Sequence, residues 1–169
     1  MFVLGIAGAL GSGKSTLARM IITSFSNSTI MPFAYPLKKF AVDLGWDGKK
    51  NNKGRRLLQL IGTDCGRECI DEDIWINKWE VFRSEAKTNG KELFIGDDMR
   101  FKNEIDHILM LRGVTIKMVG RDSYTSEAQK NHPSEKGLDN KDFDFVFDNA
   151  GTIDDMQVFA KTVVDYLNV

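Results

Sequence analysis

Eight residues near the N-terminus have the types and the spacing that bind phosphate groups. The segment 8–15 reads GALGSGKS, so it carries Gly, Gly, Lys and Ser at every fixed position of a glycine-rich phosphate loop. The glycines let the main chain curl until successive N–H groups point inward at phosphate oxygens. Lys14 adds a mobile cation, and the hydroxyl of Ser15 suits Mg²⁺. The loop therefore predicts a site for a nucleoside triphosphate. The expected contacts are Gly8, Gly11, Ser12, Gly13, Lys14, Ser15 and Thr16.

A site of this kind also needs a carboxylate near the metal ion, and that carboxylate commonly ends a hydrophobic strand. Residues 93–96 are apolar or glycine and run directly into Asp97 and Asp98. We choose Asp98 as the group that holds Mg²⁺ through water, with Asp97 as the alternative. The alternative is that Asp97 and Asp98 bind no metal ion and are an ordinary pair of acidic turn residues at the strand end.

Two arginines follow predicted strands, at the edge where ligands of open parallel sheets bind. Arg100 comes two residues after Asp98, and its planar guanidinium can hold a phosphate through two N–H groups. Arg121 follows the next strand and opens a polar segment, and a well-placed arginine accelerates phosphoryl transfer by about 10³–10⁵. A surface arginine at a strand end is the alternative for Arg121. The expected catalytic residues are Lys14, Asp98, Arg100 and Arg121.

A predicted helix around residues 58–69 carries a polar edge. Gln59, Thr63 and Arg67 are spaced four apart, which places them on one side of an α-helix. This edge could face an anionic or base-bearing substrate, and a solvated helix face is an equally natural interpretation.

Four other side chains in this part of the chain are expected to pack in a core. Cys65 and Cys69 lie one helical turn apart, but the two histidines of the chain do not have the spacing of a zinc site, which leaves both cysteines a packing role. Trp75 and Trp79 form a stripe at helical spacing, which favours a core over a platform for a nucleotide base.

Strand and helix patterns alternate along the chain, which predicts an α/β domain with a parallel sheet. Strands are expected over residues 2–7, 29–33, 93–96, 114–119 and 143–147. Helices are expected after the glycine loop, from Pro36 to Gly45, and around residues 58–69, 75–82, 105–109 and 153–167. Thr152 with Asp155 three residues later resembles a capping box for the last helix. The basic segment 46–56 is expected to be a loop.

The composition limits the class of protein. The chain has 169 residues, of which 42% are hydrophobic and 28% charged, so we expect one folded domain and exclude a disordered chain. Two cysteines exclude a disulfide scaffold, and no apolar run approaches the ~18 residues of a membrane span. The apolar start has no basic leader, so we expect an intracellular protein.

The charge is unevenly distributed. The first 60 residues carry nine basic and two acidic side chains, which suits an anionic ligand. The net charge of the whole chain is −1, however, which argues against duplex nucleic acid as a partner.

The whole chain resembles the phage-type deoxynucleoside monophosphate kinases, which belong to the P-loop kinases together with adenylate and thymidylate kinases. The glycine loop is common to P-loop proteins, whereas the blocks PLK at 36–38, GTDCGR at 62–67 and DMRFKNE at 98–104 point to this family. Shorter matches lie at 73–75, 121, 132–135 and 148–151. Some of the phage enzymes carry Asp after the loop lysine, where this chain has Ser15, the ordinary choice in P-loop proteins.

The resemblance implies a three-layer P-loop fold over residues 1–169 with a five-stranded parallel sheet. It implies a helical monophosphate-binding region over about 34–90 and a short lid over about 121–140. The implied reaction moves the γ-phosphoryl group of ATP, bound with Mg²⁺, to a deoxynucleoside monophosphate, giving the diphosphate and ADP. We expect a cytoplasmic protein, in the host cytoplasm if a phage encodes it, with a nucleoside monophosphate as its substrate and no nucleic acid or membrane partner. The sequence is compatible with a homodimer but does not determine the oligomeric state.

The resemblance also implies where the acceptor nucleotide binds. Lys38 and Arg67 would contact it, and Lys38 and Arg100 would hold its phosphate. The full set of expected acceptor contacts is Leu10, Lys38, Arg67, Trp75, Asp98, Arg100, His132 and Glu135.

On the donor side, the resemblance implies that Asn149 and Ala150 lie near the adenine of ATP. Arg121 would contact ATP as well, and with the lid through Glu135 it would close over the reaction.

Two other functions are compatible with the sequence. One is another small-molecule P-loop kinase, such as a dephospho-coenzyme A kinase, and the other is a nucleotide-dependent switch or ATPase that is not a kinase. A switch should lack a second anion site, whereas Lys38, Arg67 and Arg100 predict one.

Overall fold

The structure is a computed structural model that describes residues 2–122 and 138–168. The chain divides into two compact units, and each is described by itself. We call Phe33–Asn89 the helical unit, and residues 1–32 together with 90–169 the sheet unit. The bounds of the helical unit lie within one residue of the segment 34–90 to which the resemblance assigns monophosphate binding.

Five parallel strands form the sheet, in the order β2-β3-β1-β4-β5. They are β1 Phe2–Gly8, β2 Ser28–Ile30, β3 Leu93–Met99, β4 Val114–Val119 and β5 Phe145–Asp148. In the central strand β1, Leu4 pairs with Ile95 of β3 and with Val114 of β4. The prediction of an α/β fold with five parallel strands is confirmed.

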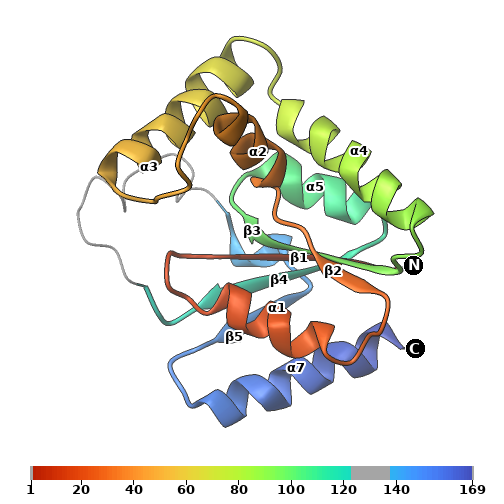
Figure 1. Cartoon of the computed structure of the whole chain (residues 1–169). Coiled ribbons are helices and arrows are strands. Elements are labelled where there is room, and N and C mark those ends of the chain that lie inside the picture. The colour runs from red at the N-terminus through yellow and green to blue at the C-terminus, as the bar shows by residue number, and fades with distance from the viewer. Residues whose placement is uncertain (1, 123–137, 169) are drawn as a thin grey trace. The chain divides into compact units, whose positions relative to one another are not determined.

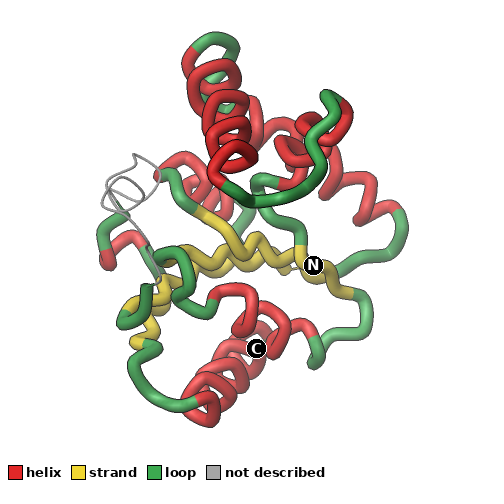
Figure 2. The backbone as a smooth tube through the Cα atoms, turned by 60° about the vertical axis from the view of Figure 1, so that its left-hand side comes forward, coloured by secondary structure: helices red, strands yellow, loops and turns green. Residues whose placement is uncertain are grey.

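Helices cover both faces of this sheet (Figures 1 and 2). α1 Lys14–Ile22 and α7 Ile153–Leu167 pack together on one face, and α5 Lys102–Met110 lies on the other. A short 3₁₀ helix, η3 Asn140–Asp142, precedes β5. Burial of each Leu or Ile side chain contributes about 1.5–3 kcal/mol, so the core beneath α1 and α7 fixes the strands whose ends carry the candidate site. Its fully buried aliphatic side chains include Leu4, Ile6, Leu17, Ile21, Ile95 and Ile116.

The capping box predicted for the last helix is present. The backbone N–H of Asp155 donates to Oγ1 of Thr152 at 3.3 Å, and the backbone N–H of Thr152 donates to Oδ2 of Asp155 at 2.7 Å. These bonds satisfy N–H groups that have no partner inside the helix. They fix the start of α7 directly after the turn that ends β5.

The helical unit contains α2 Tyr35–Asp43, α3 Asn52–Gln59, the π-helix η1 Leu60–Glu68 and α4 Ile74–Thr88. Trp75 packs with Ala41 and Ile61 in its core. Phe33 stacks on Trp79 with 4.7 Å between the ring centroids. Both tryptophans are buried, as the sequence pattern favoured.

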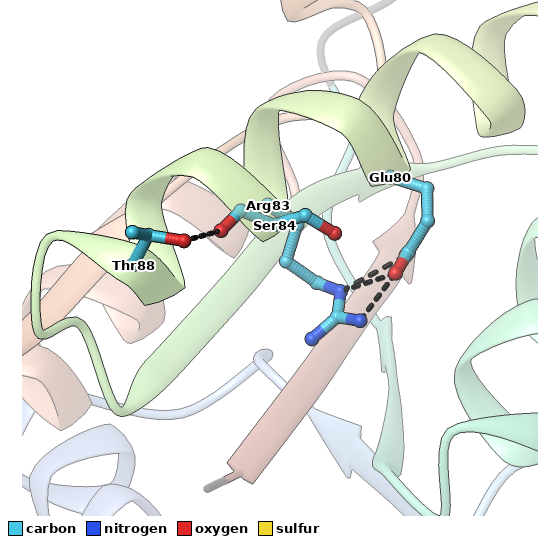
Figure 3. Close-up of polar contacts among 4 residues, drawn as sticks. All are labelled: Glu80, Arg83, Ser84 and Thr88. Carbon is cyan, nitrogen blue, oxygen red and sulfur yellow. Dashed lines mark hydrogen bonds and ion pairs between the residues drawn. The ribbon is translucent and has the colours of Figure 1, made fainter.

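α4 carries a buried ion pair, which Figure 3 shows. Arg83 is 6% exposed, and its Nε donates to Oε2 of Glu80 at 2.9 Å. One turn further on, the hydroxyl of Thr88 donates to the carbonyl of Ser84 at 3.0 Å (Figure 3). A buried guanidinium is tolerated only when its charge is paired, and Glu80 provides that charge on the same helix.

The prediction of a loop over residues 46–56 is wrong at its end, because α3 begins at Asn52. The side chain of Asn51 accepts the backbone N–H of Gly54 at 2.9 Å and so caps this helix. Local capping therefore outweighs the glycine and the like charges that favoured a loop. The second strand, expected over 29–33, ends earlier than expected, at Ile30.

The prediction that Cys65 and Cys69 pack in a core is wrong, because both are exposed. Residues 60–68 form a π-helix, whose hydrogen bonds join residues five apart, so the apolar spacing typical of an α-helix does not apply to this segment. Ile61 is buried while Cys65 is exposed.

The third strand continues to Met99, three residues beyond its predicted end. Asp97 and Asp98 therefore lie inside a strand, at an irregularity of its pairing: Gly5 of β1 pairs with Gly96 and Ala7 with Met99, so both aspartates lie opposite the single residue Ile6. Asp97 is buried and Asp98 is half-buried. In the parts of the chain that the structure describes, no helix has both the length and the apolar character needed to span a membrane.

Candidate active site

The glycine loop connects β1 to α1. Gly13 has a φ of 95°, and a Cβ added there would lie 2.7 Å from Nδ2 of Asn149. Gly8 has a φ of 147°, and a Cβ there would lie 2.6 Å from the carbonyl oxygen of Met118. Both positions therefore need glycine for space as well as for backbone conformation. The N-terminus of α1 has no side-chain cap, so its first N–H groups can bind an anion.

The side chain of Lys14 folds back into this loop. Its Nζ donates to the carbonyl oxygens of Gly8 and Ala9, each at 2.7 Å. Burial, followed by the charge of Arg100, lowers the pKa of Lys14 from 10.5 to about 8, and the nearby carboxylates oppose this shift. A bound polyphosphate would reverse the shift, because opposite charge favours the protonated amine.

Ser15 and Asp97 come together from positions far apart in the sequence. The hydroxyl of Ser15 donates to Oδ2 of Asp97 at 2.6 Å, although 82 positions separate the two residues. Asp97 is 7% exposed, whereas Ser15 is exposed to solvent. The pair therefore presents a hydroxyl oxygen and a carboxylate beside Lys14, which is a donor set that suits Mg²⁺.

These oxygen ligands fit a metal ion that arrives with phosphate. Mg²⁺ usually binds one or two carboxylates, several waters and substrate phosphate oxygens. Among residues 2–122 and 138–168, no group of three or more His, Cys, Asp and Glu side chains is placed to hold a metal ion. Ser15 and Asp97 would supply two of the oxygen ligands, and phosphate and water would supply the others.

Arg100 follows β3 and is held by its backbone. Oε2 of Glu104 accepts the main-chain N–H of Arg100 at 2.7 Å and that of Phe101 at 3.2 Å. Glu104 is 4% exposed, so this capping contact at the start of α5 is well shielded. The charge of Arg100 reaches Lys14, whose pKa it lowers. The structure thus brings Lys14, Asp98 and Arg100 within electrostatic range of one another.

Arg121 lies at the end of β4 and contacts the turn after β5. Its Nη2 donates to the carbonyl of Gly151 at 2.7 Å. In the same turn, Nδ2 of Asn149 donates to the carbonyl of Ser12 at 3.0 Å, and Asn149 is 4% exposed. Ala150 is exposed. Asn149 is therefore engaged with the glycine loop, and only Ala150 of the expected adenine pair is open to a ligand.

The remaining predicted residues are distributed over the chain. Leu10 is half-buried in the glycine loop of the sheet unit. Lys38 is half-buried on α2, and Arg67 donates through Nη1 to the carbonyl of Glu72 at 2.9 Å, both in the helical unit. His132 and Glu135, like most of the predicted lid, lie outside the described residues.

Trp75 is also in the helical unit and is 8% exposed. Its indole N–H donates to the carbonyl of Gly62 at 2.8 Å. A Cβ added to Gly66 would lie 2.8 Å from the same indole nitrogen, so the ring is closely surrounded. This environment supports a packing role, and the contact of Trp75 with a substrate stays a prediction.

Sequence reasoning preferred Asp98 to Asp97 and gave no structural role to Asn149. Asp97 is buried and its partner Ser15 lies 82 positions away, so the contact that distinguishes Asp97 is not local in the sequence. The contact of Asn149 with Ser12 crosses 137 positions, and nothing in the local sequence encodes it.

Comparisons with known proteins give one family. Residues 42–159 match the family of deoxynucleotide monophosphate kinases. The fold is similar to the crystal structure of TT1252 from Thermus thermophilus, with a TM-score of 0.61, 18% identity, and coverage of 98% of this chain and 97% of that one. No curated protein sequence matches the chain. Because the family match covers well over half of its residues, the chain belongs to the deoxynucleotide monophosphate kinases, a family of phosphotransferases.

Proposed function

We propose that this protein transfers the γ-phosphoryl group of ATP to a deoxynucleoside monophosphate, producing the diphosphate and ADP. The observation that carries the proposal is the hydrogen bond between Ser15 and Asp97 beside Lys14, in the glycine loop of a chain from this kinase family. The family match favours this reaction over a dephospho-coenzyme A kinase and over a switch that does not transfer phosphate.

The glycine loop binds the donor. The main-chain N–H groups at the start of α1 bind the phosphates, and the partial positive charge of the helix N-terminus adds to this attraction. Lys14 leaves the carbonyls of Gly8 and Ala9 and pairs with the β- and γ-phosphates. When bound, Mg²⁺ neutralises charge that develops on the phosphate oxygens.

We assign the metal contact to Ser15 and, through water, to Asp97. The structural support is that Asp97 is buried and already accepts the hydroxyl of Ser15 at 2.6 Å, whereas Asp98 is half-buried. Asp98, which the sequence favoured, stays the competing assignment. Its charge raises the pKa of Lys14, which gives it an electrostatic role in either case.

Cationic side chains bind the acceptor phosphate. Arg100, Lys38 and Arg67 are proposed for this role, because each carries charge and hydrogen-bond donors that suit a phosphate. Arg121 is proposed to stabilise charge on the transferred group. One acceptor oxygen attacks phosphorus in line, so catalysis is positioning and charge stabilisation, and the protein supplies no nucleophile.

A panel of acceptors tests the reaction. Purified protein is incubated with ATP, Mg²⁺ and each of the common nucleoside and deoxynucleoside monophosphates, and ADP and diphosphate products are separated by ion-exchange chromatography. The proposal expects equal amounts of ADP and of one or more deoxynucleoside diphosphates. ADP formation that is independent of every acceptor would contradict it. The variant Lys14→Ala is the control for contaminating kinases.

Assembly and cellular setting are the last part of the proposal. We propose a protein that works in the cytoplasm, which is the host cytoplasm if a phage encodes it, and a homodimer as the assembly to test. Analytical ultracentrifugation at micromolar concentration tests the first part, since a homodimer has twice the 19.1 kDa of one chain.

A further inference from the structure

A buried amide connects the glycine loop to the turn that follows β5. We infer that Asn149 is a positioning residue, which aims the main-chain N–H of Gly13 at a bound phosphate by holding the carbonyl of Ser12. The inference rests on the proposed function only for the identity of the ligand. It requires that the loop bind a nucleotide, and it does not require phosphoryl transfer.

The contact between Asn149 and Ser12 is buried and closely packed. Nδ2 of Asn149 donates to the carbonyl of Ser12 at 3.0 Å, and both residues are buried, at 4% and 0% exposure. A Cβ on Gly13 would lie 2.7 Å from the same nitrogen, so the amide packs directly against the loop backbone. A buried carbonyl that lost this donor would be left unsatisfied.

The geometry of the peptide unit turns this contact into control of a phosphate ligand. The peptide between Ser12 and Gly13 is planar and trans, so its C=O and N–H point in opposite directions. A donor that fixes the Ser12 carbonyl therefore fixes the Gly13 N–H on the other side. Glycine at position 13 gives the backbone little stiffness of its own, which makes an external contact necessary.

The other end of the contact is rigid. The backbone N–H of Asn149 donates to the carbonyl of Val119 at 2.9 Å, which extends the pairing of β5 with β4. Oδ1 of Asp148 accepts the N–H of Ala150 at 3.0 Å, which closes the turn. Asn149 thus connects the glycine loop to a turn that is itself hydrogen-bonded to the sheet.

The same turn holds a second predicted part of the site. Nη2 of Arg121 donates to the carbonyl of Gly151, two residues after Asn149. One short turn therefore contacts both the glycine loop and the proposed charge-stabilising arginine. Loss of the Asn149 side chain should disturb the loop while the backbone contact to Arg121 remains.

The test measures binding of ADP with Mg²⁺ by calorimetry for the wild type, Asn149→Ala and Thr152→Ala. Thr152→Ala is the matched control, because its hydroxyl caps α7 three residues later and contacts only Asp155 among the hydrogen bonds described. It lowers stability in the same region without touching the loop. A melting curve of each variant measures that loss, and the amide chemical shift of Gly13 on ADP binding gives a direct structural readout.

We expect Asn149→Ala to weaken ADP binding at least fivefold and to reduce the shift of the Gly13 amide, whereas Thr152→Ala keeps affinity within fivefold despite a lower melting temperature. A smaller loss in Asn149→Ala, or an equal loss in Thr152→Ala, would overturn the inference. Should Asn149→Ala fail to fold, Asn149→Ser carries the same comparison, because its hydroxyl is too short to reach Ser12.

The outcome is separable from that of the proposed function. If the protein binds ADP but phosphorylates no monophosphate, the proposed reaction fails while the comparison of Asn149→Ala with Thr152→Ala still decides the inference. If it phosphorylates a monophosphate and Asn149→Ala binds ADP normally, only the inference fails.

Discussion

Replacement of Asp97 by Asn tests which of two adjacent carboxylates serves the metal ion. The substitution keeps the shape of the side chain and lets Ser15 donate to an amide oxygen, but it removes the negative charge. Asp98→Asn is the matched control, since it removes the same charge one residue along β3. A difference between the two variants therefore reports which carboxylate the metal ion uses.

The magnitude follows from the position of Asp97. Its carboxylate is 7% exposed and lies 2.6 Å from the hydroxyl of Ser15, so its charge is poorly screened by water. Loss of an outer ligand of this kind usually weakens metal binding about 10–100-fold. That corresponds to about 1.4–2.7 kcal/mol at 25 °C. Asp98→Asn should change the requirement for Mg²⁺ by less than about threefold.

The assay is the initial rate of diphosphate formation at fixed ATP and acceptor, with Mg²⁺ as the variable. We expect the Mg²⁺ concentration at half-maximal rate to rise about 10–100-fold in Asp97→Asn only. The opposite order would refute the assignment to Asp97 and establish Asp98. Equal changes in both variants would refute the assignment of the metal contact to Asp97 alone.

Three further outcomes are expected. The pKa of Lys14 is about 8 in the folded protein and 10.5 in the unfolded chain, so the folded state loses its proton first as the pH rises. The free energy of unfolding, compared with that of Lys14→Met, should therefore rise between about pH 8 and 10.5, by up to about 3 kcal/mol in chemical denaturation. A difference between the two proteins that does not vary with pH would contradict the buried amine. Arg121→Ala should keep the melting temperature and ADP affinity and lower kcat about 10³-fold, and a loss below about tenfold would remove Arg121 from the catalytic residues. Trp75→Phe should cost about 1–3 kcal/mol of stability, because it leaves the buried carbonyl of Gly62 without its donor. Weaker acceptor binding without loss of stability would instead make Trp75 a substrate contact.

Local patterns in the sequence predict much of the fold. The glycine loop, the strand over 114–119 and the capping box at Thr152 each have a recognisable pattern over a few consecutive residues, and the structure has them at the predicted residues. The π-helix over Leu60–Glu68 is different, because apolar spacing alone does not distinguish it from an α-helix. The prediction that the two cysteines pack in a core assumed an α-helix and is wrong for this reason.

The candidate site is less predictable because its central contacts join distant residues. The contact of Ser15 with Asp97 depends on how far β3 continues past Gly96, and the strand is longer than its apolar pattern predicts. The contact of Asn149 with Ser12 depends on the register of β5 against β4 and on the path of the following turn. Residue types alone identify the chemistry, whereas the partners require the folded sheet.

Single-turnover transfer of labelled phosphate tests the central claim most directly. Excess enzyme is mixed with ATP labelled on the γ-phosphate, Mg²⁺ and a deoxynucleoside monophosphate, and the reaction is stopped with acid after successive intervals. If the chain is the kinase proposed here, the label passes from ATP to a deoxynucleoside diphosphate, and Lys14→Met abolishes the transfer. Label that accumulates only as inorganic phosphate, at a rate unaffected by the acceptor, would contradict the account.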